Sequence, residues 1–343
     1  MHNVSVIVVC LNEKNNIGLC IESLIEQEYP AEHYEIIVVD NGSADGTIEI
    51  VEKYISAGKN IRLIHNPVIG IAGSRNLGIS NAAHDLVAFT DADCIAPKEW
   101  LKKLVEGYNK YHAKDKQVAG VGGSNVPPTG SARFYDVLHI FLNTYLGSHG
   151  SVQGKRFEQD RPVPHLPTVN ILLYKPAVIR TGGFDVTFGN IGEDQDLSFR
   201  MQRNGFKYFY IKDAIVFHKL RPTFKKWLQN MFLYGKGRAW VMKKYPGKIE
   251  PLLFLPALLV FSLLFIFAAV LSAIFLLPLL YFIFILAASL YEAAKCKRPD
   301  YFFDLFVLFA GTHIDYGAGQ WYGLFKKRQK QYSMYEEIVL NNN

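Results

Sequence analysis

The stretch VAFTDADC, residues 87–94, runs apolar for three residues and then places Asp91 and Asp93 on either side of Ala92. The apolar run predicts a buried strand, and in an extended chain residues two apart point to the same side. Two like charges at this spacing repel each other unless a cation lies between or beside them. The pair therefore predicts a metal site at the end of a buried strand.

Short β-branched runs alternate with helical patterns through the first 120 residues. This order predicts an α/β fold in which a parallel sheet carries helices on both faces. Ligands of such sheets bind beyond the carboxyl ends of the strands. Polar clusters follow three predicted strands, and we expect them to line one crevice: Asn12 with Glu13, Asp40 with Asn41 and Gly42, and Asp91 with Asp93.

Two further features of this half indicate a nucleotide site. Asp40 directly follows the apolar run EIIVV, and a carboxylate in that position is suited to accept hydrogen bonds from a base N–H or a ribose hydroxyl. GIAGSRN, residues 70–76, predicts a Gly-rich turn that opens a helix. We expect this turn to offer backbone N–H groups and Arg75 to an anion such as a diphosphate. The stretch is not a P-loop, because no G-K-[ST] follows it.

Three acids in four positions open a predicted helix later in the chain: Glu193, Asp194 and Asp196 follow Gly192. Interaction with the helix dipole explains one or two acids in a first turn, but three exceed what capping requires. A carboxylate near a metal and a diphosphate can accept a proton from an attacking hydroxyl, which contributes about 10² to 10⁴ in rate.

The C-terminal part predicts membrane contact. Residues 252–291 contain no charged residue and no histidine, whereas about 20 helical residues cross a bilayer. With Pro278 at the turn, we expect a transmembrane helical hairpin over 249–294. The nine Lys and Arg of residues 219–248, without an acid, favour an anionic lipid surface over nucleic acid. We therefore expect basic amphipathic interfacial helices over 221–248 and no nucleic-acid partner.

The remaining segments carry weaker signals. Residues 131–148 predict an amphipathic helix that suits the protein core and a membrane surface equally. Residues 147–167 are rich in Gly, Pro and polar side chains and predict a mobile loop of the size that often gates a site. Residues 295–343 are expected to hold a membrane-associated or third transmembrane segment and a basic tail. A crossing over 301–325 would place KKRQK outside, so we expect a re-entrant or interfacial segment there.

The ordered combination of strand-end Asp40, the D-x-D of TDADC, and GGFD followed by GEDQDL resembles the family 2 glycosyltransferases, which have the GT-A fold. The resemblance covers roughly residues 3–245. It implies a Rossmann-like, mostly parallel sheet in a cytosolic catalytic domain over 1–220, followed by transmembrane helices. Among membrane-tethered relatives, the layout resembles the succinoglycan-type polysaccharide biosynthesis sugar transferases, which extend a lipid-linked oligosaccharide from the cytoplasmic side.

The resemblance also implies roles for individual residues. Asp194 resembles the catalytic base, and Glu193 is expected beside the acceptor. Asp93 resembles the ligand of Mn²⁺ or Mg²⁺, with Asp91 beside it near the ribose and diphosphate. His218 corresponds to a histidine that completes the metal shell in some relatives, and a purely structural hydrogen bond is its alternative role. The residues expected to bind the donor nucleotide are Leu11, Asn12, Glu13, Asp40, Gly42, Arg75 and Asp91.

The implied activity is inverting, metal-dependent transfer of a sugar from a nucleoside-diphosphate donor to a lipid-linked saccharide at the cytoplasmic face of the cell membrane. One alternative is a polyprenyl-phosphate sugar transferase, and another is an inactive scaffolding subunit of an envelope glycan complex. Polymerising relatives carry Q-x-x-R-W, whereas GKGRAW retains only Arg238 and Trp240, so we do not expect processive synthesis. A homo-oligomer is compatible with the resemblance.

Overall fold

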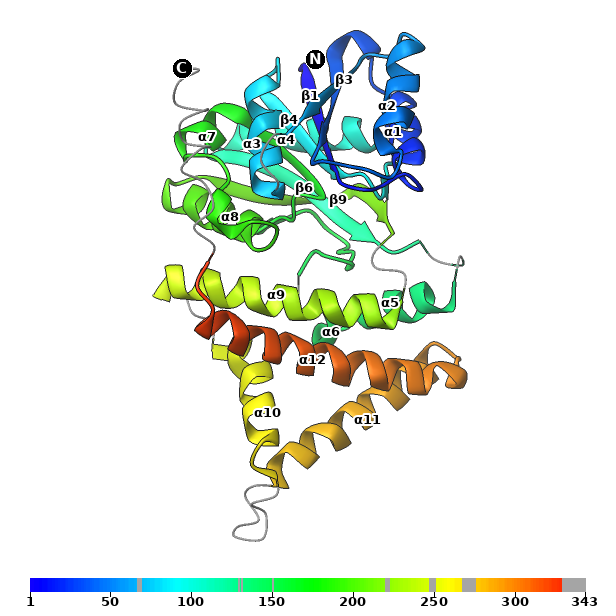
Figure 1. Ribbon diagram of the computed structural model, residues 1–343, viewed down its shortest axis with the longest axis vertical. Helices are drawn as coiled ribbons and strands as arrows, with labels where there is room; N and C mark the ends of the chain where they lie inside the picture. Colours follow the sequence, from blue (N-terminus) through cyan, green and yellow to red (C-terminus); the bar gives the residue numbers. More distant parts are fainter. Residues whose placement is uncertain are drawn as a thin grey trace. The chain divides into compact units, whose positions relative to one another are not determined.

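The computed structural model describes residues 1–66, 70–128, 130, 132–149, 151–219, 223–246, 251–266 and 276–328. They form two compact units (Figure 1). Unit 1 contains Met1–Val126 and Val152–Lys219, and unit 2 contains the described parts of Pro127–Ser151 and Leu220–Arg328. Unit 1 is a mixed α/β structure, whereas every regular element described in unit 2 is a helix.

The first half of the sheet in unit 1 is parallel. Its strands lie in the order β3-β2-β1-β4, as in one half of a doubly wound fold. Valine and isoleucine dominate β1 and β2, because both strands are buried on both faces. The bounds are β1 (Val4–Cys10), β2 (Tyr34–Asp40), β3 (Ile61–His65) and β4 (Leu86–Asp91).

The second half of the sheet is mixed. Strand β8 is antiparallel to both β4 and β6, β6 is parallel to β9, and β5 and β7 are antiparallel to β9. The expected mostly parallel sheet is therefore correct for the first four strands and for the pair of β6 and β9, whereas β5, β7 and β8 are antiparallel to their neighbours. The bounds are β5 (Cys94–Ile95), β6 (Val118–Val126), β7 (Arg161–Val163), β8 (Asn170–Tyr174) and β9 (Lys207–His218).

Helices cover both faces of the sheet, as the sequence predicts. Alternate residues of β1 separate into two cores: Val6 and Val8 belong to one, and Ile7 belongs to the other. The first core includes residues of α1 (Ile17–Ile25), α2 (Thr47–Ser56) and α4 (Trp100–Lys114). The second includes residues of α3 (Ile71–Asn81), α7 (Lys175–Arg180) and α8 (Glu193–Arg203). Two short 3₁₀ helices are η1 (Ala31–His33) and η2 (Val186–Phe188).

In unit 2, α9 and α12 lie side by side (Figure 1). Glycines permit this close approach: a Cβ atom at Gly319 would lie 1.9 Å from the carbonyl oxygen of Phe232, and one at Gly235 would lie 2.0 Å from that of Tyr316. The bounds are α5 (Arg133–Asn143), α6 (Tyr145–Ser148), α9 (Phe224–Lys244), η4 (Pro251–Phe254), α10 (Leu255–Leu263), α11 (Leu277–Lys295), η7 (Pro299–Tyr301) and α12 (Phe302–Phe325).

The amphipathic helices of unit 2 bury their apolar sides in protein. Trp227 and Met231 of α9 share a core with Phe141 of α5 and Phe309 of α12. The stripe of α9 that we expected in the lipid headgroups is therefore covered by neighbouring helices, and residues 224–244 form one helix. This core also explains why residues 127–151 group with the C-terminal helices and not with the predicted domain over 1–220.

Pro278, which we placed at the turn of the predicted hairpin, lies in the first turn of α11, which begins at Leu277. Within the described part of the chain, one helix is long and apolar enough to cross a membrane, Pro278–Lys295. The other half of the predicted hairpin includes residues 267–275, which lie outside the described residues, as does the predicted tail over 329–343. Residues 302–325 form one continuous helix, α12.

Candidate active site

The sheet brings the polar ends of three strands together. Cys10 at the end of β1 pairs in register with Asp40 at the end of β2, and Val9 pairs with Asp91 at the end of β4. Parallel pairing places all three ends at the same edge of the sheet. The predicted meeting of the three polar clusters is confirmed at the level of the strands.

The loops that follow β1 and β2 are hydrogen-bonded to each other. The Asn12 N–H donates to Ser43 Oγ at 2.8 Å, and Asn12 Oδ1 accepts from the Ala44 N–H at 2.9 Å. The Glu13 N–H donates to Thr47 Oγ1 at 2.8 Å. These bonds fix Asn12 in a left-handed conformation, with φ of 56°, next to the exposed side chain of Leu11.

Asp40 stabilises its own turn. Its buried Oδ2 accepts from the N–H of Gly42 at 2.9 Å and of Ser43 at 3.1 Å. Gly42 supports this turn with φ of 94°. Asp40 thus has a structural role that its position in the sequence did not reveal, and binding of the donor base by Asp40 and Gly42 stays a prediction.

The start of α3 does not present free N–H groups to an anion. The Gly70 N–H donates to Asn41 Oδ1 at 3.0 Å, the Ile71 N–H to Asn190 Oδ1 at 2.9 Å, and the Ala72 N–H to the Gly189 carbonyl at 3.4 Å. The expectation that these amides hold a diphosphate is wrong, because each already has an acceptor within unit 1.

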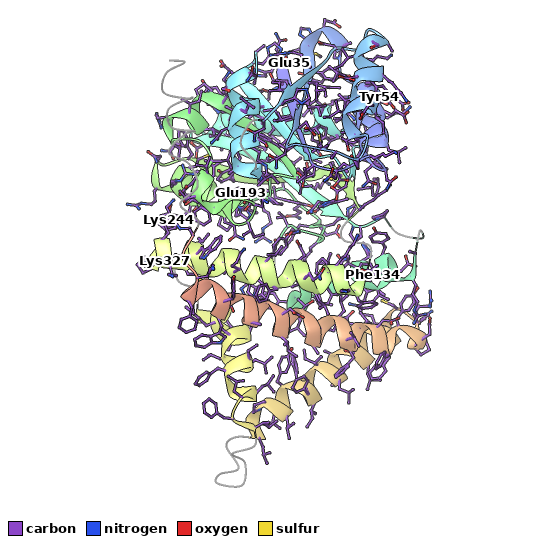
Figure 2. All side chains as sticks on the ribbon, in the orientation of Figure 1. Glu35, Tyr54, Phe134, Glu193, Lys244 and Lys327 are labelled. Carbon is purple, nitrogen blue, oxygen red and sulfur yellow. The ribbon has the colours of Figure 1, made fainter. Side chains whose placement is uncertain are left out.

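Arg75 connects the strand ends to the start of α8. Its guanidinium lies 3.6 Å from Asp91 Oδ1, donates a hydrogen bond to Glu193 Oε1, and lies over the Phe184 ring. Only 4% of the Arg75 side chain is exposed, so two carboxylates and a ring enclose most of it. Glu193 lies where α8 begins (Figure 2). Arg75 therefore connects Asp91 with the first acid of α8, Glu193.

Asp91 and Asp93 do not share one extended strand. Strand β4 ends at Asp91, and the chain turns through Ala92 and Asp93 into β5. The premise that the two carboxylates point to the same side of one extended strand is therefore wrong. Strand β5 pairs with the end of β9, with Cys94 opposite His218, and this pairing brings Asp93 Oδ1 to 3.1 Å from His218 Nε2.

The group formed by Asp93, Cys94 and His218 fits a divalent cation. Their candidate ligand atoms lie within 4.8 Å of one another. The Cys94 thiol is a soft donor, which Mn²⁺ and Mg²⁺ favour less than a carboxylate oxygen. The donors that remain are a carboxylate oxygen and an imidazole nitrogen, a set that suits Mn²⁺ or Mg²⁺.

His218 has a second contact that the sequence did not indicate. Its Nδ1 lies 3.2 Å from Nδ2 of buried Asn125 on β6, which leaves Nε2 facing Asp93. An amide nitrogen donates, so Nδ1 accepts in this contact and the proton of the neutral ring lies on Nε2, toward Asp93. The contact therefore supports the structural role of His218, and its metal-binding role stays a prediction, because a metal needs Nε2 without that proton.

The three acids of α8 have different surroundings. Glu193 is buried, and burial raises its pKa to about 7 even though Arg75 favours the charged form. Asp196 is fully buried and forms an ion pair with Arg200 at 2.7 Å. The Asp194 side chain is 21% exposed, and its Oδ1 accepts from the Gln195 N–H at 2.7 Å. Asp194 is thus the most accessible of the three carboxylates.

His165 is a residue of the site that the sequence analysis missed. It lies between β7 and β8, inside the loop predicted over 147–167, and its Nε2 is 3.7 Å from Asp194 Oδ2. Its Nδ1 lies 2.9 Å from Ser198 Oγ. A single histidine between two prolines gave no signal of this contact.

A sheet with a doubly wound half and carboxylates at its carboxyl edge is typical of α/β proteins that bind ligands at that edge. The chain belongs to glycosyltransferase family 2. The family described as "Glycosyl transferase family 2" matches residues 5–158, and "Glycosyl transferase family group 2" matches residues 86–293, which is more than half of the chain. The prediction of a transferase enzyme is confirmed, and the scaffolding alternative loses its support.

Individual relatives agree with this assignment. The chain is 26% identical over 335 residues to "Dolichyl N-acetyl-alpha-D-glucosaminyl phosphate 3-beta-D-2,3-diacetamido-2,3-dideoxy-beta-D-glucuronosyltransferase" of Methanococcus voltae, covering 95% of this chain and 98% of the relative. It is 26% identical over 242 residues to "Succinoglycan biosynthesis protein ExoA" of Rhizobium meliloti, covering 68% of each chain. The predicted resemblance to succinoglycan-type transferases is thus confirmed.

The fold also has a solved counterpart. The mannosyltransferase PcManGT from Pyrobaculum calidifontis, in complex with GDP-Man and Mn²⁺, has a TM-score of 0.61 and 20% sequence identity. The match covers 95% of this chain and 88% of the mannosyltransferase. At this identity the similarity concerns the fold alone, and the mixed α/β architecture resembles that of GT-A glycosyltransferases.

Proposed function

We propose that this glycosyltransferase moves a sugar from a nucleoside-diphosphate donor to a lipid-linked saccharide at a membrane surface, with inversion at the anomeric carbon. The observation that carries the proposal is the Arg75 bridge, which joins the strand end at Asp91 to the start of α8. The bridge supports the proposal because Asp91 is two residues from the metal candidate Asp93 and Glu193 is next to Asp194.

Each group has a chemical task in this proposal. Asp93 and His218 hold Mn²⁺ or Mg²⁺, which when bound supplies positive charge for the departing diphosphate. Asp194 accepts the proton of the acceptor hydroxyl as that oxygen attacks the anomeric carbon from the face opposite the diphosphate. Because a single displacement occurs, the configuration inverts. Arg75 acts by holding Glu193 and Asp91, since its guanidinium is buried between them.

The acceptor is proposed from two independent supports. The Methanococcus voltae relative, which matches nearly the whole chain, is named for a dolichyl-linked sugar phosphate. In unit 2, apolar side chains of α10 and α11 face outward (Figure 2). Leu258, Leu280 and Ile283 of these helices are each more than half exposed. Exposed apolar surface of this kind marks a membrane or protein contact. We assign it to the membrane, as part of the hairpin over 249–294, with the catalytic unit on the cytoplasmic face.

A donor panel tests the proposal directly. Purified full-length protein is incubated with GDP-mannose, UDP-N-acetylglucosamine or UDP-glucose, with Mn²⁺ or Mg²⁺, and with a polyprenyl-diphosphate-linked sugar as acceptor. We expect release of the nucleoside diphosphate with one donor, dependence on the cation, and a product one sugar longer. Cation-independent turnover, or a product that keeps the donor's anomeric configuration, would contradict the mechanism.

The alternative acceptor is polyprenyl phosphate itself. An acceptor phosphate is already ionised and needs no base to remove a proton. An accessible carboxylate such as that of Asp194 is useful when the acceptor is a hydroxyl, so it favours a hydroxyl acceptor. Product analysis separates the two: a single sugar on polyprenyl phosphate identifies the alternative, whereas a longer glycan supports the proposal.

A further inference from the structure

We propose that His165 is a positioning residue for the catalytic base, because it orients the carboxylate of Asp194 toward the acceptor hydroxyl. This inference rests on the proposed role of Asp194. The carrying observation is the separation of 3.7 Å between His165 Nε2 and Asp194 Oδ2 within unit 1. The two residues come from different elements, a loop and the first turn of α8.

The backbone on both sides of His165 is anchored. The carbonyl of Pro164 accepts a hydrogen bond from Gln202 Nε2, a side chain of α8. On the other side, Leu166 is 1% exposed and belongs to the second core of the sheet. This part of the predicted mobile loop is therefore held against α8 and the core. The position of the His165 backbone is set independently of any contact with Asp194.

The His165 ring is oriented as well. Its Nδ1 lies 2.9 Å from Oγ of Ser198, which is 3% exposed. Ser198 belongs to the same helix as Asp194 and is four residues further along, so both lie on one side of α8. With Nδ1 directed at Ser198, the other ring nitrogen, Nε2, is the one that faces Asp194.

The Asp194 carboxylate is thus held from two sides. Oδ1 accepts from the Gln195 N–H at 2.7 Å, and Oδ2 faces His165. Each carboxylate oxygen can accept about two hydrogen bonds, so each keeps an acceptor position for the substrate. Without the imidazole, the carboxylate can rotate about its Oδ1 contact. A misplacement of about 1 Å in a reacting group can cost about 10² in rate.

The inference predicts a specific kinetic signature. His165→Ala should lower kcat about 10- to 100-fold while KM for the donor changes less than about twofold, because the donor contacts lie elsewhere. Two conservative variants separate the ring's contacts. His165→Gln places an amide near the position of Nε2 and should recover most of kcat, whereas His165→Asn places one near Nδ1 and should not.

A matched control is His84→Ala, which removes a half-buried histidine that precedes β4 at the opposite end of that strand. It should leave both kinetic constants unchanged. Thermal unfolding of each variant shows whether the fold persists. If His165→Ala fails to fold, the contrast between His165→Gln and His165→Asn still decides, because a merely structural histidine would not distinguish them.

The closing experiment measures the His165 variants in the wild-type and Asp194→Asn backgrounds, using the donor that the panel turns over. We expect His165→Ala to lower kcat in the first background and to change the residual rate less than about twofold in the second. Equal losses in both backgrounds, or an unchanged kcat in the wild-type background, would overturn the role of His165 while the base assignment stands. Ordinary turnover by Asp194→Asn alone would overturn both.

Discussion

The two acidic clusters of unit 1, residues 91–94 and 193–196, look alike in the sequence and differ in the structure. In each cluster the first acid lies against Arg75, but Asp91 is 29% exposed and Glu193 only 6%. The next acid of each cluster lies beside a histidine, Asp93 beside His218 and Asp194 beside His165. The strand-end cluster places a carboxylate of the kind that binds metals, Asp93, beside His218. The helix cluster leaves one carboxylate, that of Asp194, accessible to solvent.

This difference shows that the role of an acid is decided by the partner that the fold supplies. Glu193 and Asp194 are neighbours in the chain, yet one is buried in an ion pair and the other is accessible. If the assignment is correct, substitutions in the two clusters should affect different quantities: turnover, the free energy of unfolding, and the dependence on the cation.

The largest effect is expected at Asp194. Asp194→Asn keeps the size and the Gln195 contact but removes the basic oxygen, so kcat should fall about 10² to 10⁴-fold. Donor binding should persist, because the proposed donor groups are unchanged. Turnover and binding of the nucleoside diphosphate are measured on the same preparation. A variant with normal kcat would show that another group takes the proton.

Removal of the shared arginine should affect the fold more than the chemistry. Arg75→Ala leaves Glu193 buried without its partner, which typically costs about 3–5 kcal/mol. The free energy of unfolding is measured by denaturant titration at pH 8. The control is Lys103→Ala, which removes ion pairs at the surface of α4 and should cost at most about 1 kcal/mol. Equal losses in the two variants would mean that the Arg75 bridge is not a buried pair in solution.

The strand-end cluster should control the cation. Asp93→Asn should raise the Mn²⁺ concentration for half-maximal activity by at least about 10- to 100-fold. Loss of a residue that only hydrogen-bonds to a metal ligand already weakens metal binding by this much, and Asp93 is proposed to bind the metal itself. Cys94→Ala is the matched control in the next position, and it should leave this concentration unchanged because a soft thiol is a poor ligand for Mn²⁺. A comparable shift in Cys94→Ala would make the sulfur a ligand.

The sequence predicted the convergence of strand ends because that feature follows from local patterns. Apolar runs identify β1, β2 and β4, and parallel pairing then places Asp40 and Asp91 at one edge. The place of Pro278 is similarly local, since proline is favoured in the first turn of a helix. These features needed no knowledge of which distant residues meet.

The features that the sequence did not reveal depend on distant pairings. Arg75 and Glu193 are 118 positions apart, and nothing near either residue indicates the other. The antiparallel insertion of β8 and the contact between His165 and Asp194 are likewise products of tertiary packing. The apolar stripe of α9 is compatible with lipid and with protein, and only the presence of α12 decides between them.

The smallest effect concerns the pH dependence of stability, to which Glu193 should contribute. Burial raises the pKa of Glu193 from an ordinary value of 4.5 to about 7. Between these pH values the folded chain keeps the Glu193 proton and the unfolded chain has released it, so the free energy of unfolding falls as pH rises. This contribution is complete below pH 4.5 and lost above pH 7.

The measurement is the free energy of unfolding of wild type and Glu193→Gln at several pH values across this window. Glutamine cannot ionise, so Glu193→Gln lacks this contribution. As pH rises, the free energy of unfolding of wild type should therefore fall relative to that of Glu193→Gln. A wild type that gains stability relative to Glu193→Gln as pH rises would show that the attraction of Arg75 outweighs burial. The ion pair would then be the favoured state throughout, and the contrast between the two acids would rest on accessibility alone.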